Sequence, residues 1–162
     1  MLTHPNVIAV QHALDAADAR NHAGDGCRVI VLDDGVHTAA AAAAALGVAP
    51  AQIANSLIFE VDGEPLLVLT SGGHRVDTAK VAADLGVAKL RRATPEFVRE
   101  HTGQVIGGVA PLGHPKPVRT LIDTALAAYG EIWAAGGVPQ AVFPITYPEL
   151  LRVTSATPAE VA

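Results

Sequence analysis

Hydrophobic residues recur at helical spacing in several stretches of the chain, and residues that favour helix ends bound each stretch. In the first stretch, Val7 and Val10 lie three positions apart, and Pro5 suits the first turn of a helix. In the second, a run of alanines lies between Thr38, a typical N-cap, and Gly47, a typical C-cap. The pattern predicts helices at residues 5–19, 39–46, 76–85 and from Thr94 onward, and short helical turns after Pro50 and at 124–128, 147–153 and 158–161.

Runs of β-branched and aliphatic residues predict strands between these helices. The clearest pair spans residues 53–61 and 65–71, joined by Asp62-Gly63, a dipeptide that favours a tight hairpin turn. Pro144 interrupts the last run. Because proline cannot donate a hydrogen bond to a neighbouring strand, we expect this strand at an edge or an end of the sheet. The other strands are expected at 28–32, 89–92, 118–122, 131–135 and 141–145.

This alternation of many short strands with short helices defines an α/β fold class. A hairpin among the strands favours a mixed or antiparallel sheet over a doubly wound parallel one. The chain has 162 residues, so we expect a single domain over residues 1–162 that buries about 70% of its unfolded surface. Half of the residues are hydrophobic but only 4% are aromatic, so Ala, Val, Leu and Ile must build the core.

Composition then narrows the environment of the protein. No apolar run approaches the roughly 20 residues of a membrane span, and the first residues lack the features of a signal peptide. A single cysteine, Cys27, excludes an internal disulfide and fits a reducing compartment. We therefore expect a cytoplasmic protein with no membrane partner. The net charge of −5 argues against non-specific nucleic-acid binding, yet residues 75–119 hold eight basic and four acidic residues.

Residues 107–113 carry the strongest local signal for a binding site. Three glycines and a proline in seven residues cannot continue a helix or a central strand. A loop of this kind presents backbone N–H groups at close range, which suits a carbonyl, carboxylate or phosphate oxygen. The alternative interpretation is a tight connection between two strands.

Other catalytic patterns find little support in the sequence. Seven histidines are present, but no pair has the spacing of a zinc site, so no metal and no cofactor is expected. No Gly-x-Ser-x-Gly motif is present, and residues 71–74 (Ser-Gly-Gly-His) lack the Gly-Lys-Ser/Thr of a phosphate-binding loop and predict a turn. Cys27 and Trp133 are interpreted as core residues.

Five segments of the chain stand in an order that matches a known family. They are 37–48 (His-Thr-Ala, an alanine-rich helix and Leu-Gly-Val), 52–59 (Gln-Ile-Ala-Asn-Ser-Leu-Ile-Phe), 76–80 (Val-Asp-Thr-Ala-Lys), 107–113 and 121–123 (Leu-Ile-Asp). With them, the chain resembles the YbaK and prolyl-tRNA-synthetase-associated editing family from about residue 28 to about 153. The resemblance implies a curved mixed, largely antiparallel sheet or barrel flanked by short helices. It also implies hydrolysis of the ester that joins a wrong amino acid to the 3′ end of a tRNA.

Asn55 departs from the pattern of that family, whose members typically carry a lysine at this strand position. An ammonium group supplies a full positive charge to a phosphate or a developing oxyanion, whereas an amide donates only neutral hydrogen bonds. Asparagine can still serve as an oxyanion donor, so this substitution leaves activity possible by a changed mechanism. The alternative is a structural amide that is bonded to the local backbone.

The expected catalytic site lies between the loop and the strand around Asn55. We expect the Asn55 amide and the backbone N–H groups of Gly108 and Val109 to polarise the ester carbonyl. A water molecule, activated by hydroxyl groups of the substrate rather than by a protein base, then attacks the carbonyl carbon. The expected substrate-binding residues are Thr38, Ser56, Gly107, Ala110, Pro111 and Asp123.

Three of these residues have equally good structural interpretations. Thr38 can be a helix cap, and Ser56 can be an ordinary strand hydroxyl. Asp123 matches a family position at the end of a strand, where it can orient the substrate or accept hydrogen bonds from the loop at 107–113.

Two classes of function remain at the level of the sequence. The first is an enzyme, a trans-editing aminoacyl-tRNA deacylase whose partners are the aminoacylated 3′ end of a tRNA and an aminoacyl-tRNA synthetase. The second is a non-catalytic module that binds aminoacyl-tRNA ends or small amino-acid derivatives. An Asn55 amide directed into an open pocket favours the enzyme, and an amide bonded to the backbone beside a filled pocket favours the module.

Overall fold

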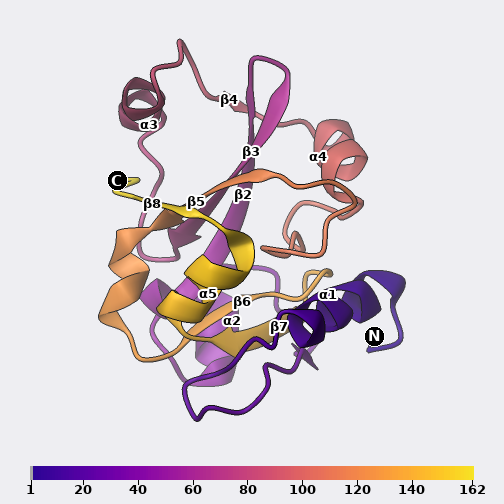
Figure 1. Cartoon of the computed structure of the whole chain (residues 1–162). Coiled ribbons are helices and arrows are strands. Elements are labelled where there is room, and N and C mark those ends of the chain that lie inside the picture. Colours follow the sequence, from indigo (N-terminus) through magenta and orange to yellow (C-terminus); the bar gives the residue numbers. More distant parts are fainter. Residues whose placement is uncertain (1) are drawn as a thin grey trace.

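A single mixed β-sheet organises the chain in the computed structural model, which describes residues 2–162 (Figure 1). Its strand order is β1-β7-β6-β2-β3-β5-β8, and β4 pairs with β2 outside this path. The pairs β1/β7, β6/β7, β2/β3 and β2/β4 are antiparallel, whereas β2/β6, β3/β5 and β5/β8 are parallel, which confirms the expected fold class. The strands are β1 (Ile30–Val31), β2 (Ile53–Val61), β3 (Glu64–Ser71), β4 (Arg91–Arg92), β5 (Arg119–Asp123), β6 (Ile132–Ala135), β7 (Ala141–Ile145) and β8 (Thr157–Ala159).

Local capping signals set the ends of the helices. The Thr38 hydroxyl accepts a hydrogen bond from the Ala41 N–H at the start of α2, and Gly47 ends that helix with a φ of 70°. The expected helix at 76–85 begins later, at Thr78, because the Asp77 carboxylate caps it. The helices are α1 (Pro5–Ala16), α2 (Ala39–Leu46), α3 (Thr78–Leu85), α4 (Pro95–Thr102) and α5 (Tyr147–Thr154), with short 3₁₀ turns at η1 (Pro50–Gln52) and η2 (Thr124–Ala128).

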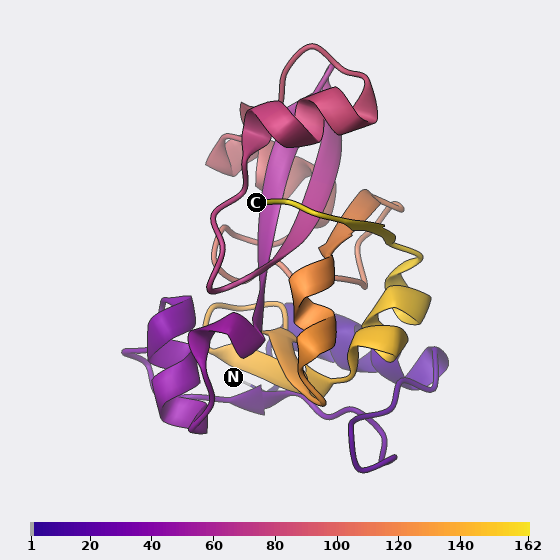
Figure 2. The same cartoon turned by 90° about the vertical axis from the view of Figure 1, so that its left-hand side faces the viewer.

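The hairpin of β2 and β3 runs through the height of the molecule, with α3 and α4 on its opposite sides (Figures 1 and 2). One face of the hairpin carries Phe59, Leu66 and Val68, which pack against buried residues of α3. The other face carries Ile58 and Leu67, which join the main core. Apolar residues on both faces explain why β3 reads as a nearly continuous hydrophobic run.

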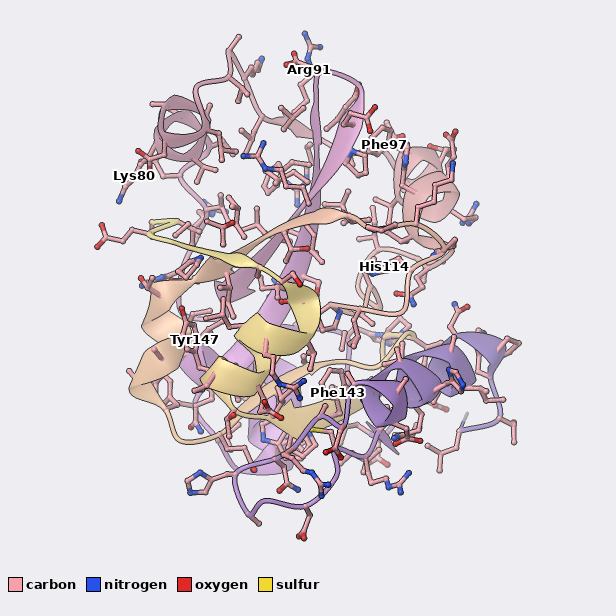
Figure 3. All side chains as sticks on the ribbon, viewed as in Figure 1. Lys80, Arg91, Phe97, His114, Phe143 and Tyr147 are labelled. Carbon is pink, nitrogen blue, oxygen red and sulfur yellow. The ribbon has the colours of Figure 1, made fainter. Side chains whose placement is uncertain are left out.

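The main core lies where α1, α5 and strands β6 and β7 meet one face of the hairpin. Val7, Val10 and Leu14 of α1 are buried in it, as the helical spacing predicts. Phe143, beside α1 in Figure 3, has no exposed surface. Burying an apolar side chain of this size stabilises a fold by about 1.5–3 kcal/mol. The core is otherwise built from aliphatic residues, as the composition requires.

Two expectations for the C-terminal part were wrong. Residues 158–161 form no helical turn, because Thr157–Ala159 pair in parallel with β5 as strand β8. Strand β7 lies between β1 and β6 rather than at an edge. However, β1 pairs only with Ala141 and Val142, so Pro144 lies beyond the end of β1. A residue there needs no N–H to bond to β1, and proline is therefore tolerated.

Candidate active site

Strand β2 has a gap in its pairing on the side away from β3. On that side β6 pairs with Ile53 and Ala54, and β4 pairs with Phe59 and Glu60. Positions 55–58 therefore have no strand partner there. An unpaired stretch inside a strand exposes backbone donors and acceptors that a ligand can use.

The direction of the neighbouring peptide groups shows which backbone groups face this gap. The Ile53 carbonyl accepts a hydrogen bond from the Gly72 N–H at 2.8 Å on the β3 side, and the Ile58 carbonyl accepts one from the Ala93 N–H at 3.4 Å on the β4 side. Because peptide groups alternate sides along a strand, the N–H and C=O of Ser56 point into the gap.

Two cavities meet at the gap. The larger has a volume of about 590 Å³ and the smaller about 300 Å³. Asn55, Ser56 and Val109 line both cavities. The predicted strand position and the predicted loop therefore do come together in space, on the wall that the two cavities share.

The side chain of Asn55 is free for a ligand. Asn55 is exposed, and its amide forms no hydrogen bond with any part of the chain that the structure describes. The structural interpretation, in which the local backbone satisfies this amide, is therefore wrong. The neighbouring Ser56 hydroxyl is buried and also has no hydrogen-bond partner within residues 2–162. A buried hydroxyl without a partner lowers the stability of the fold. A ligand that forms a hydrogen bond with it recovers this free energy on binding.

The glycine loop reaches this wall through Gly107 and Val109, whereas Gly108 lines neither cavity. Gly107 lines the smaller cavity with a φ of +89°, a conformation that favours glycine. A Cβ on Gly108 would lie 2.7 Å from the Val138 backbone, so only glycine fits there. The Gly108 N–H donates to the Val105 carbonyl at 3.0 Å, and its predicted role as an oxyanion donor is therefore not available in this conformation.

Ala110 and Pro111 hold the loop instead of lining it. Both are buried and contribute to neither cavity. The Ala110 N–H donates to Gln104 Oε1 at 2.7 Å, and His114 Nε2 donates to the Ala110 carbonyl at 2.7 Å. Burial lowers the pKa of His114 below its ordinary value of 6.5, although its bond to Ala110 opposes this effect. The neutral ring is thus the form that the folded protein favours.

Thr38 and Asp123 differ in how they relate to the cavities. Thr38 caps α2 and also lines the smaller cavity, so its role in substrate binding stays a prediction. Asp123 is 1% exposed and lines neither cavity. Its carboxylate accepts no hydrogen bond from the glycine loop, contrary to one expectation, and instead bonds to groups of β3 and η2 and to His74.

Sequence reasoning missed the polar residues of the larger cavity. His74, Arg75 and Arg92 line it together with Asn55. Arg92 reaches this position because β4 pairs with β2, Arg92 standing opposite Phe59. No local pattern marks these residues. The position of Arg92, for example, depends on its pairing with Phe59, which lies far away in the sequence. The excess of basic residues over 75–119 was the one signal that included both arginines.

The site offers little for catalysis by a metal ion or by a cysteine nucleophile. Among residues 2–162, no group of three or more His, Cys, Asp or Glu side chains is arranged to hold a metal ion. Cys27 is buried away from both cavities, and burial together with Glu149 and Glu131 raises the pKa of its thiol to about 11. Within residues 2–162 no helix has both the length and the apolar character needed to cross a membrane.

The chain shares its sequence and its fold with a known class of protein. Residues 33–153 match the aminoacyl-tRNA editing domain, and the chain belongs to that family. A crystal structure of a candidate trans-editing enzyme for prolyl-tRNA synthetase superposes with a TM-score of 0.88 and 42% identity. The match covers 97% of this chain and 96% of that one.

Curated relatives match over a shorter length. The proline–tRNA ligase of Levilactobacillus brevis is 35% identical over 93 residues, which are 57% of this chain but only 16% of the ligase. The uncharacterised protein YwhH of Bacillus subtilis is 32% identical over 110 residues, which cover 67% of this chain and 69% of YwhH. The chain thus corresponds to a small part of the ligase and to most of YwhH.

Proposed function

We propose that this chain is an aminoacyl-tRNA deacylase, which hydrolyses the ester between a wrong amino acid and the 3′ end of a tRNA. Membership of the editing-domain family supports this reaction. The observation that carries it in this chain is the free amide of Asn55 on the wall shared by two cavities. A cytoplasmic location and an aminoacyl-tRNA synthetase as a second partner belong to the same proposal.

The two cavities suit the two ends of such a substrate. The smaller cavity is lined mainly by small and apolar residues, among them Ala42, Ala134 and Val142, and accepts the amino-acid side chain. The larger cavity contains Arg75 and Arg92 and accepts the terminal nucleotide with its phosphate. The ester between these parts then lies at Asn55.

The chemistry at this point follows from the available donors. The Asn55 amide and the N–H groups of Ser56 and Val109 stabilise the negative charge that develops on the carbonyl oxygen. Water adds to the carbonyl carbon, the bond to the ribose oxygen breaks, and that oxygen takes a proton. Losing one such donor costs about 10²–10³ in rate. Val109 keeps the backbone role expected of it, and Ser56 replaces Gly108, whose N–H is already bonded.

The alternative of a non-catalytic binding module has less support. It requires an Asn55 amide that is bonded to the backbone beside a filled pocket. The amide has no hydrogen-bond partner within residues 2–162, and both cavities beside it are open. Asn55 therefore replaces the family lysine as the hydrogen-bond donor, and the site stays open to a substrate.

Single-turnover deacylation of a panel of mischarged tRNAs tests the proposal. The panel includes alanyl-, cysteinyl- and seryl-tRNA(Pro), with the unaltered protein beside Asn55→Ala and Asn55→Lys. We expect the unaltered protein to cleave at least one member and Asn55→Ala to cleave it about 10²-fold more slowly. No cleavage by the unaltered protein, with cleavage by Asn55→Lys, would instead establish a binding module.

A further inference from the structure

Polar groups at the ends of β3 and β5 form a hydrogen-bonded cluster beside the larger cavity. Asp123 Oδ2 accepts hydrogen bonds from the Ser71 N–H at 3.0 Å and from the Thr70 hydroxyl at 3.4 Å. His74 Nδ1 lies 2.8 Å from the same oxygen. Asp123 Oδ1 accepts a further bond from the Ala125 N–H at 3.0 Å. The buried carboxylate is therefore held in one orientation.

This cluster determines how His74 presents its ring. A carboxylate accepts hydrogen bonds, so the proton of a neutral His74 ring lies on Nδ1. Nε2, on the side of the ring away from Asp123, is then left with a free lone pair. The His74 side chain is 39% exposed and lines the larger cavity. The cavity wall thus carries a ring nitrogen, Nε2, that can accept a proton, because Asp123 holds the proton of the neutral ring on Nδ1.

His74 also belongs to the same stretch of wall as Asn55. Thr70 stands directly opposite Asn55 in the β2/β3 hairpin, and opposite residues share a face with Cβ atoms about 4.5–5.5 Å apart. Thr70 and His74 both bond to Asp123 Oδ2. Asn55, Thr70 and His74 all line the larger cavity. A substrate bonded to the Asn55 amide is therefore bordered by this histidine.

We propose that His74 is the general base of the deacylation, with Asp123 as its positioning residue. Nε2 takes a proton from the attacking water as the water oxygen bonds to the ester carbonyl carbon. When the tetrahedral intermediate breaks its bond to the ribose oxygen, Nε2 returns the proton to that oxygen. The products are the free amino acid and the tRNA with its hydroxyl restored. This inference rests on the proposed function and replaces the expectation that only substrate hydroxyls activate the water.

A purely structural His74 would only connect the end of β3 to the end of β5, and substitutions distinguish the two roles. His74→Asn keeps a side-chain N–H that can reach Asp123 in place of Nδ1 but has nothing in place of Nε2. His74→Ala removes both nitrogens and leaves space for an added imidazole molecule. His12→Ala is the matched control, because His12 is an exposed residue of α1 that lines neither cavity.

The test is single-turnover hydrolysis of the fastest member of the tRNA panel. We expect His74→Ala and His74→Asn to lower the rate constant by about 10²–10⁴. The substrate concentration at half-maximal rate should change by less than threefold, and added imidazole should raise the rate of His74→Ala at least tenfold. His12→Ala should match the unaltered protein, with and without imidazole.

Other outcomes overturn the inference in distinguishable ways. A His74→Asn variant with the full rate would make His74 a structural residue. A higher substrate concentration at half-maximal rate, with an unchanged rate constant, would make His74 a binding residue. If added imidazole does not raise the rate of His74→Ala, proton transfer by the ring is excluded. No cleavage of any panel member by the unaltered protein would overturn the proposed function and this inference together.

Discussion

At the scale of single residues, the fold leaves two adjacent polar side chains of β2 without internal partners. The Asn55 amide is exposed at the gap, and the Ser56 hydroxyl is buried there with no partner within residues 2–162. Most buried polar atoms in folded proteins are hydrogen-bonded, so an unpartnered one beside a cavity marks a position where function outweighs stability.

Replacing Ser56 with alanine separates these two contributions. Because the hydroxyl forms no hydrogen bond in the folded protein, Ser56→Ala should leave the free energy of unfolding unchanged or raise it by up to about 1 kcal/mol. The deacylation rate should fall by about tenfold or more if the substrate bonds to the hydroxyl. Urea unfolding and single-turnover rates measure the two effects.

Ser71→Ala is the contrasting control for stability. The Ser71 hydroxyl donates to the Ala51 carbonyl at 2.8 Å, so its removal should lower the free energy of unfolding by about 1–3 kcal/mol. Equal losses of stability in Ser56→Ala and Ser71→Ala would contradict an unpartnered Ser56 hydroxyl.

Gly107 offers a second prediction at the scale of residues, because Gly63 has nearly the same backbone conformation but lines neither cavity. Gly107 and Gly63 have φ values of +89° and +84°, and an added Cβ at either meets no atom within 4 Å. Gly107→Ala and Gly63→Ala should each cost about 1–2 kcal/mol of stability from backbone strain. Only Gly107→Ala adds a methyl group beside the smaller cavity, so only it should slow deacylation markedly.

At the scale of elements, the loop 107–113 owes its shape to side chains that hold Ala110 from both sides. Gln104 is 2% exposed and accepts from the Ala110 N–H, and the His114 ring donates to the Ala110 carbonyl. These bonds place Gly107 and Val109 at the cavity wall. The inner residues of the loop therefore act by shaping it, and its role in substrate binding stays a prediction.

The pKa of His114 makes the stability of this loop region sensitive to acid. Burial lowers this pKa in the folded protein, so the unfolded chain binds the proton more readily. The contribution to stability is present above about pH 6.5 and is lost as the pH falls through the folded pKa. The free energy of unfolding should thus fall as the pH is lowered below about 6.5, and His114→Gln should reduce this fall. An unchanged pH dependence of stability in His114→Gln would show that His114 is not the group responsible.

At the scale of the whole molecule, charge is distributed unevenly around the site. The chain carries a net charge of −5, but residues 75–119 hold twice as many basic as acidic residues. Arg75 and Arg92 from this stretch line the larger cavity. An acidic protein with a local basic wall binds a polyanion at one place and repels it elsewhere.

Neighbouring arginines in β4 provide a matched test of this arrangement. Arg92 lines the larger cavity, whereas Arg91 lines neither cavity and lies at the outer end of the hairpin in Figure 3. Arg92→Ala should weaken tRNA binding and reduce the slope of log affinity against log salt by about 0.7, the value for one phosphate of a single strand. Arg91→Ala should change the slope much less. Equal effects would argue for general attraction without a phosphate site.

Sequence patterns alone determined most of the elements and the family. The Asp62-Gly63 turn, the Thr38 and Gly47 caps and the alternation of short strands and helices are local signals, because turn geometry and capping depend on adjacent residues. They predicted the hairpin, helix α2 and the mixed sheet. That residues 1–162 act as one domain, and that Asn55 and Val109 take part in catalysis, stay predictions.

Only the tertiary structure decided which polar groups share the site. Strand β8, the gap in β2 and the position of Arg92 depend on pairings between distant segments, which local propensity does not encode. His74 and Asp123 are 49 residues apart in the chain, and they meet because the parallel strands β3 and β5 end side by side. Sequence signals of short range thus specify elements and caps, whereas long-range pairing brings the reactive groups together.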